Sequence, residues 1–76
     1  MPYTTAERVG ANVRAAARIR HLTQSDLADA LGLTQSRISD RMRGTVAFDI
    51  NELGVIAEIL DVPVADLFTG RAGISA

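Results

Sequence analysis

A short polar run, Gln35-Ser36-Arg37, has the side chains of this sequence best suited to hydrogen bonding with another molecule. Glutamine can bond the N6 and N7 atoms of adenine through two hydrogen bonds, and arginine can bond guanine O6 and N7. Serine is small and can donate to a neighbouring base or accept from it. The run follows Thr34, a residue that caps helices well, so we expect it in the first turn of a helix. Any helix start could carry these residues, so their meaning depends on the elements around them.

Two short helices joined by a tight turn are predicted to position this run. The first spans residues 24–31 after a capping threonine, Thr23, and the second spans residues 35–43. Residues 32–34 join them, and the leading glycine can adopt the positive φ that turns the chain. Two helices with a three-residue joint of this kind are the sequence form of a helix-turn-helix.

The remainder of the chain is also predicted to be helical. Thr4 and Glu7 form a capping-box pattern that opens a first helix, which ends near His21 in a left-handed conformation. A fourth helix begins after Asp49, and a short fifth turn starts at Pro63. The sequence therefore predicts an all-α fold, a compact five-helix bundle that contains the helix-turn-helix.

The composition fits one small domain. The chain has 76 residues, of which 47% are hydrophobic and 4% are aromatic, so its core is built mainly from aliphatic side chains. We predict a domain over residues 1–68, and a flexible C-terminal tail or linker over residues 69–76, which are small, polar and glycine-bearing. Gly10 lies inside the first helix, where it indicates the close approach of another helix.

Positive and negative charge separate along the chain, although the net charge is only −1. Residues 8–43 contain seven arginines and three aspartates, whereas residues 44–76 contain one arginine and five acidic residues. A chain with such opposed halves can meet phosphate with one end and stay near neutral overall.

Several elements in order resemble one known family. The run TQSDLADALGLTQSRISDRMRG resembles the helix-turn-helix of the Cro and phage-repressor type, often called the XRE family. The resemblance continues through FDINELGVIAEILDVPVADLF and back through VGANVRAAARIRHLTQ, so it covers about residues 8–68. It implies a lambda-repressor-like DNA-binding domain whose helix at residues 35–43 enters the major groove of double-stranded DNA.

The resemblance and the polar face of this helix together indicate two sets of DNA-contacting residues. The base-reading candidates are Gln35, Ser36, Arg37, Ser39 and Asp40. The phosphate-binding candidates are Gln24, Thr34, Arg43 and Thr45, with Arg14 and Arg18 on the outer side of the first helix. The two arginines of the first helix could equally form an ordinary solvated face.

Two residues depart from the family pattern. Arg41 stands where the family usually carries a bulky apolar residue, so we expect the end of the helix to pack through Met42. Asp40 adds negative charge beside the reading face. It could pair with Arg37 or Arg43, or it could accept a hydrogen bond from cytosine N4.

Other classes of function find little support in the sequence. There is no cysteine and only one histidine, so no disulfide or usual zinc site is predicted, and no catalytic residue or cofactor is expected. The paired acidic residues are explained by helix capping. The N-terminus lacks a signal peptide, and no apolar run approaches the roughly 18 residues that span a bilayer, which predicts a cytoplasmic protein without a membrane partner.

The sequence therefore predicts a sequence-specific transcriptional regulator, a repressor that binds a near-palindromic operator as a homodimer. The alternative is an antitoxin or anti-repressor, a protein-interaction module that uses the same fold to hold a protein partner. Its basis is the acidic C-terminal half and an apolar end formed by Val62, Val64, Phe68 and Ile74.

Overall fold

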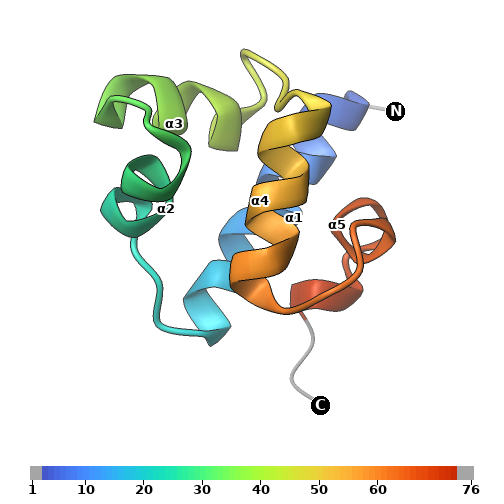
Figure 1. Ribbon diagram of the computed structural model, residues 1–76. Coiled ribbons are helices and arrows are strands. Elements are labelled where there is room, and N and C mark those ends of the chain that lie inside the picture. Colours follow the sequence, from blue (N-terminus) through green and yellow to red (C-terminus); the bar gives the residue numbers. More distant parts are fainter. Residues whose placement is uncertain (1–2, 74–76) are drawn as a thin grey trace.

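Helix caps and turn residues divide the chain into short helices (Figure 1). The computed structural model describes residues 3–73, and all regular structure within them is helical. The α-helices are Thr5–Ile19 (α1), Gln24–Leu31 (α2), Gln35–Arg43 (α3), Ile50–Leu60 (α4) and Ala65–Thr69 (α5), followed by a 3-10 helix, Arg71–Gly73 (η1). The predicted all-α, five-helix fold is confirmed.

Three of these helices begin with a reciprocal capping box. At the start of α1 the Thr4 backbone N–H donates to Glu7 Oε1 over 2.7 Å, and the Glu7 N–H donates to Thr4 Oγ1 over 3.1 Å. Each such pair satisfies two N–H groups that would otherwise lack a partner within the helix. The same arrangement opens α2 and α4, through Thr23 with Asp26 and Asp49 with Glu52.

Left-handed residues end the helices and turn the chain. Gly32 follows α2 with φ of 67°, a conformation that costs glycine little. His21 has φ of 59° after α1, which confirms the left-handed conformation predicted for it. Asp61 adopts a similar φ of 57° after α4. Each turn is therefore short, and successive helices fold back onto one another.

The core lies where α1 and α4 meet the helices on either side of them. In Figure 1 α4 lies in front of α1, with α2 and α3 on one side of this pair and α5 on the other. The side chains that are fully buried and largest are Val13, Leu27, Ile38, Ile56, Leu60 and Leu67. Apart from Phe48, the buried core residues are aliphatic or methionine, as the composition predicts.

Helices α1 and α3 approach each other closely at Gly10. A Cβ atom on this glycine would lie 2.4 Å from the Met42 carbonyl oxygen and 2.7 Å from that of Arg41. The last turn of α3 therefore rests on the backbone of α1, with no room for a side chain between them. This contact is the close approach that a glycine within the first helix indicated.

Arg20 clamps the opposite end of α1. Its Nε donates to the Leu60 carbonyl oxygen over 2.8 Å, and its Nη1 donates to those of Ala16 and Ala72 over 3.0 and 2.7 Å. These carbonyl groups lie at or near the C-terminal ends of α1, α4 and η1, where the helix dipole favours a positive charge. Because two of these carbonyl groups belong to α4 and η1, no local sequence pattern predicts the contacts.

Residues 69–73 pack as part of the domain, although we had predicted a flexible tail or linker over residues 69–76. Thr69 is the last residue of α5, and η1 follows with Ala72 only 1% exposed. The hydrogen bond from Arg20 to Ala72 joins residues 52 positions apart, so no local sequence pattern could predict it. Residues 74–76, which include Ile74, lie outside the described residues.

Candidate nucleic-acid interface

The helix-turn-helix has the predicted bounds, with α2 at Gln24–Leu31 and α3 at Gln35–Arg43. Within the turn, the Leu33 N–H donates to the Ala28 carbonyl oxygen over 2.9 Å. Ala28 is 3% exposed, and Ile38 of α3 is fully buried. The two helices are therefore fixed to each other and to the core, so α3 is a rigid element.

The outward face of α3 carries the predicted base-reading residues. Gln35, Ser36 and Arg37 are exposed, whereas Ile38 and Met42 are buried on the opposite face of the helix. Thr34 Oγ1 accepts a hydrogen bond of 3.2 Å from the Arg37 N–H and so caps the helix at this point. Figure 1 shows α3 at the periphery of the bundle, where a second molecule can reach it.

Gln35 is bonded to a residue that sequence reasoning missed. Its Nε2 atom donates to Ser25 Oγ over 2.9 Å, which joins the first turns of α2 and α3. Nothing in the sequence separates Ser25 from other polar residues at a helix start. The bond directs the Gln35 amide toward the first turn of α2, and one amide hydrogen and the side-chain carbonyl oxygen have no partner among the described residues.

A second polar cluster occupies the C-terminal half of α3. Arg43 Nη2 pairs with Asp40 Oδ1 at 2.5 Å, and Arg43 Nη1 donates to Ser39 Oγ over 2.9 Å. Of the two intramolecular partners considered for Asp40, the structure therefore selects Arg43 over Arg37. The pair is well exposed, at 56% for Arg43 and 35% for Asp40, so it exchanges readily with solvent.

Arg41 and Met42 resolve the departure from the family pattern. Met42 is 4% exposed and packs into the core, so the end of α3 does pack through it, as expected. Arg41 instead lies beside α4 and pairs with Glu52 across 2.9 Å. The sequence predicted no partner for this arginine.

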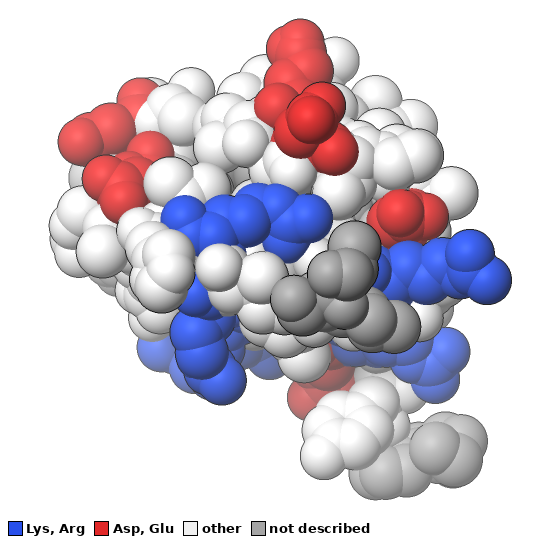
Figure 2. Space-filling model, turned by 90° about the horizontal axis from the view of Figure 1, so that it is seen from below, with Lys and Arg blue, Asp and Glu red and all other residues white. Residues whose placement is uncertain are grey.

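The remaining phosphate candidates lie on α1, at the start of α2 and in the loop after α3. Thr45 is exposed just beyond the end of α3, and Gln24, partly buried, is the first residue of α2. Arg14 and Arg18 are exposed on α1, and the structure records no hydrogen bond or ion pair from either side chain. Figure 2, a view of the end of the molecule away from α3, shows most carboxylates in its upper half and most arginines in the middle and lower half.

The cap of α2 also influences an ionisable group. The pKa of Asp26 lies below its ordinary value of 3.8 because the Thr23 backbone N–H donates to the carboxylate, with a further contribution from the Thr23 side chain. A lowered pKa in the folded state favours the ionised form. The cap therefore stabilises α2 above the ordinary pKa and loses that contribution as the pH falls through the lowered value.

Other kinds of site are not apparent in the described part of the chain. No group of three or more histidine, cysteine, aspartate or glutamate side chains lies close enough together there to hold a metal ion. Of the helices in residues 3–73, none combines the length and the apolar character needed to cross a membrane.

Comparison with known proteins agrees with this geometry. A family model described as helix-turn-helix matches residues 13–67. The crystal structure of the clp gene regulator ClgR from C. glutamicum is similar, with a TM-score of 0.81, 26% sequence identity, and coverage of 97% of this chain and 96% of that chain. No curated protein matches the sequence significantly. The chain belongs to the XRE-type helix-turn-helix family of DNA-binding domains.

Proposed function

We propose that this chain is a cytoplasmic, sequence-specific transcriptional repressor that binds a near-palindromic operator as a homodimer. Each α3 would enter the major groove at one half-site, with half-sites about one helical turn, roughly 34 Å, apart. The observation that carries the proposal is the exposed polar face of a rigidly anchored α3, on which Gln35, Ser36 and Arg37 project. The similar structure is that of a protein named as a gene regulator, which supports the same role.

The proposed contacts divide between bases and phosphates. Gln35, Ser36 and Arg37 read bases in the first turn of α3, and Ser39 and Asp40 extend the reading face. Phosphates are bound around it by Gln24, Thr34, Arg43 and Thr45, with Arg14 and Arg18 on α1. Because Arg43 bonds both Ser39 and Asp40 in the free protein, the C-terminal half of this face contacts DNA only after those bonds exchange.

Selection of bound sequences from a random duplex library tests the proposal directly. A repressor of this type should enrich a sequence with two-fold symmetry, and its affinity should fall steeply with salt as phosphate counterions are released. Enrichment of no sequence, or binding that does not respond to salt, would contradict the proposed function.

Gln35→Ala is expected to weaken operator binding by about 1–3 kcal/mol and to relax base preference at one position in each half-site. The loss follows because alanine offers no bidentate partner for an adenine edge. Fluorescence anisotropy with the selected duplex, and with duplexes changed at single positions, measures both effects. Ser25→Ala is the matched control, because it removes the partner of Gln35 in the free protein and keeps the glutamine itself. An equal loss for operator and random DNA would exclude base reading by Gln35.

Arg43→Ala is expected to weaken binding to operator and to random DNA alike, and to lower the slope of log affinity against log salt by about one. The reason is that a phosphate contact releases a counterion but carries no base information. Asp40→Asn is the companion variant, because it frees Arg43 from its pair and removes a negative charge that faces DNA. It should strengthen binding to random DNA, whereas its effect on operator binding also reports any contact that Asp40 makes to a base. A slope unchanged by Arg43→Ala would remove this residue from the phosphate set.

A protein-interaction module of the antitoxin or anti-repressor kind is the second candidate function. It is favoured by exposed apolar side chains around the start of α4 and on α5, where Ile50 is 83% and Phe68 is 44% exposed. Of the other residues in the predicted apolar end, Val64 is 41% exposed, whereas Val62 packs against the core. A tight complex with a co-purified protein, together with no salt-sensitive DNA binding, would favour this candidate.

A further inference from the structure

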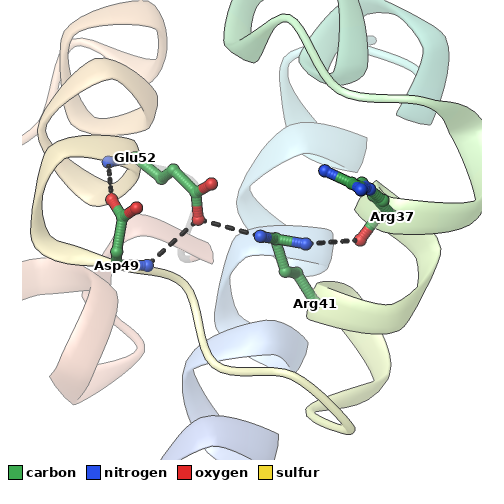
Figure 3. Close-up of polar contacts among 4 residues, drawn as sticks. All are labelled: Arg37, Arg41, Asp49 and Glu52. Carbon is green, nitrogen blue, oxygen red and sulfur yellow. Dashed lines mark hydrogen bonds and ion pairs between the residues drawn. The ribbon is translucent and has the colours of Figure 1, made fainter.

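A largely buried ion pair joins α3 to α4 (Figure 3). Arg41 Nε lies 2.9 Å from Glu52 Oε1, and the two side chains are only 16% and 14% exposed. Within residues 3–73, no other hydrogen bond or ion pair is recorded between α3 and α4, each of which packs mainly on α1 and α2. The pair therefore adds a third point of attachment for α3.

Glu52 is held in place independently of Arg41. The same Oε1 atom accepts a hydrogen bond of 3.0 Å from the Asp49 N–H, while Asp49 Oδ1 accepts one of 2.7 Å from the Glu52 N–H. This capping box ties the carboxylate to the first turn of α4. Arg41 thus meets a carboxylate whose orientation is already fixed.

On its other side, Arg41 contacts the backbone beneath a base-reading residue. Its Nη1 atom donates to the Arg37 carbonyl oxygen over 3.2 Å (Figure 3). Arg37 lies one turn earlier on the same flank of α3, and like charges at this spacing repel. The Glu52 carboxylate offsets the charge of Arg41, which leaves Arg37 as the exposed cation of that flank.

We propose that Arg41 is a positioning residue for base reading, which fixes the Arg37-bearing flank of α3 through its ion pair with Glu52. This inference rests on the proposed function. Reading side chains must be held within about 0.5 Å of their productive geometry. An apolar side chain at position 41 would pack without a preferred direction, whereas a charge-assisted hydrogen bond to a fixed carboxylate is directional. The departure from the family pattern thereby becomes part of how this chain discriminates between sequences.

The same geometry argues against a phosphate contact by Arg41. Its side chain is 16% exposed and already engaged, whereas that of Arg43, at the end of the same helix, is 56% exposed. A half-buried, neutralised guanidinium adds little to counterion release. The positioning role therefore predicts an effect on discrimination without an effect on the salt slope.

The test compares Arg41→Met, Glu52→Gln and the double variant with the wild-type chain. Glutamine at position 52 keeps an acceptor for the capping box, so α4 retains its start. Glu58→Gln is the matched control, since Glu58 is exposed on α4 and no polar contact of its side chain is recorded. Affinities are measured for the duplex that the wild type selects and for a scrambled duplex, between about 50 and 200 mM salt. Circular dichroism melts establish that each variant is folded.

We expect both single variants to lose about tenfold in the ratio of operator to scrambled affinity, with the salt slope unchanged. Because the two residues act as a unit, the double variant should lose no more than the larger single loss. Loss of a negative charge by itself would strengthen binding to both duplexes alike and leave their ratio unchanged, so lower discrimination in Glu52→Gln is not a simple charge effect. Glu58→Gln should keep the wild-type ratio.

Four results would overturn the inference. A salt slope lowered by about one in Arg41→Met identifies a phosphate contact instead. An unchanged ratio of operator to scrambled affinity in folded Arg41→Met, or in the double variant, identifies a purely structural pair. The same conclusion follows if Glu52→Gln has the same affinity ratio as Glu58→Gln. If Arg41→Met fails to fold, the double variant decides by the same ratio, because it leaves no buried charge unpaired. If the wild type shows no sequence preference, the proposed function and this inference fail together. If the wild type discriminates between duplexes and the variants discriminate equally well, only the positioning role fails.

Discussion

Replacing Arg20 with methionine is expected to lower the free energy of unfolding by about 3 kcal/mol. Methionine preserves much of the aliphatic packing but leaves the carbonyl groups of Ala16, Leu60 and Ala72 without the guanidinium that now bonds them. Hydrogen bonds to a charged group contribute about 1.5–3 kcal/mol each, and solvent that reaches the freed carbonyl groups would recover part of that loss. Urea unfolding followed by circular dichroism measures the difference.

Arg18→Met is the control for this prediction. Arg18 is exposed on the same helix, with no recorded polar contact, so its replacement should change the free energy of unfolding by no more than about 0.5 kcal/mol. Arg20→Lys keeps the charge but has all its donors on one nitrogen, whereas Arg20 uses Nε and Nη1, so it should fall between the wild type and Arg20→Met. Equal free energies of unfolding for Arg18→Met and Arg20→Met would show that the hydrogen bonds of Arg20 contribute nothing to stability.

Gly10→Ala is expected to destabilise the fold by a similar amount, about 3 kcal/mol. The added Cβ would lie 2.4 Å from the Met42 carbonyl oxygen, and a backbone atom cannot rotate away as the end of a side chain can. Relief requires that the last turn of α3 move away from α1. The same variant should therefore bind the selected operator more weakly, even at temperatures where it remains folded.

Gly54→Ala provides the opposite case within the same chain. Gly54 also lies inside a helix, α4, but no atom lies within 4 Å of the position that its Cβ would occupy. Alanine is favoured over glycine in a helix by about 1 kcal/mol, so this variant should be more stable than the wild type. Thermal melts of the two variants, run side by side, separate the steric effect from helix propensity. Stabilisation by both substitutions would contradict the tight contact at Gly10.

The helix boundaries could be predicted from the sequence because the signals that set them are local. A capping box involves residues only three apart, and a glycine or histidine that ends a helix acts through its own φ angle. For this reason the bounds of α2 and α3 agree with those predicted from Thr23, Gly32 and Thr34. Gly10 was also informative, since a glycine inside a helix costs stability unless something needs the space.

The contacts that escaped prediction join residues far apart in the chain. Arg20 reaches carbonyl groups 40 and 52 residues away, the second of which belongs to the 3-10 helix. Arg41 appeared in the sequence only as a charge in place of an apolar residue, because its partner Glu52 belongs to another helix. Local patterns cannot specify which of several nearby carboxylates a long side chain will meet.

In the candidate site, too, some features follow from local sequence patterns and others depend on how the helices pack. That Gln35, Ser36 and Arg37 lie on one exposed turn follows from helix periodicity, and the structure places them there. The bond between Gln35 and Ser25 depends on how α2 crosses α3, and the pairing of Asp40 with Arg43 depends on side-chain rotamers within α3. Which bases these residues read depends further on the angle at which α3 lies in the groove.

The capping boxes also have a kinetic consequence. Each one closes a loop of only a few residues, at the start of α1, α2 and α4, so it can form before any of these helices meets another. The costly first turn of each helix is thus stabilised within the unfolded chain. A domain dominated by such local contacts should fold within microseconds to milliseconds, on the order of the fastest helical bundles. Newly made copies would then be ready to bind soon after synthesis, and the time that exposed apolar segments remain open to aggregation would be short.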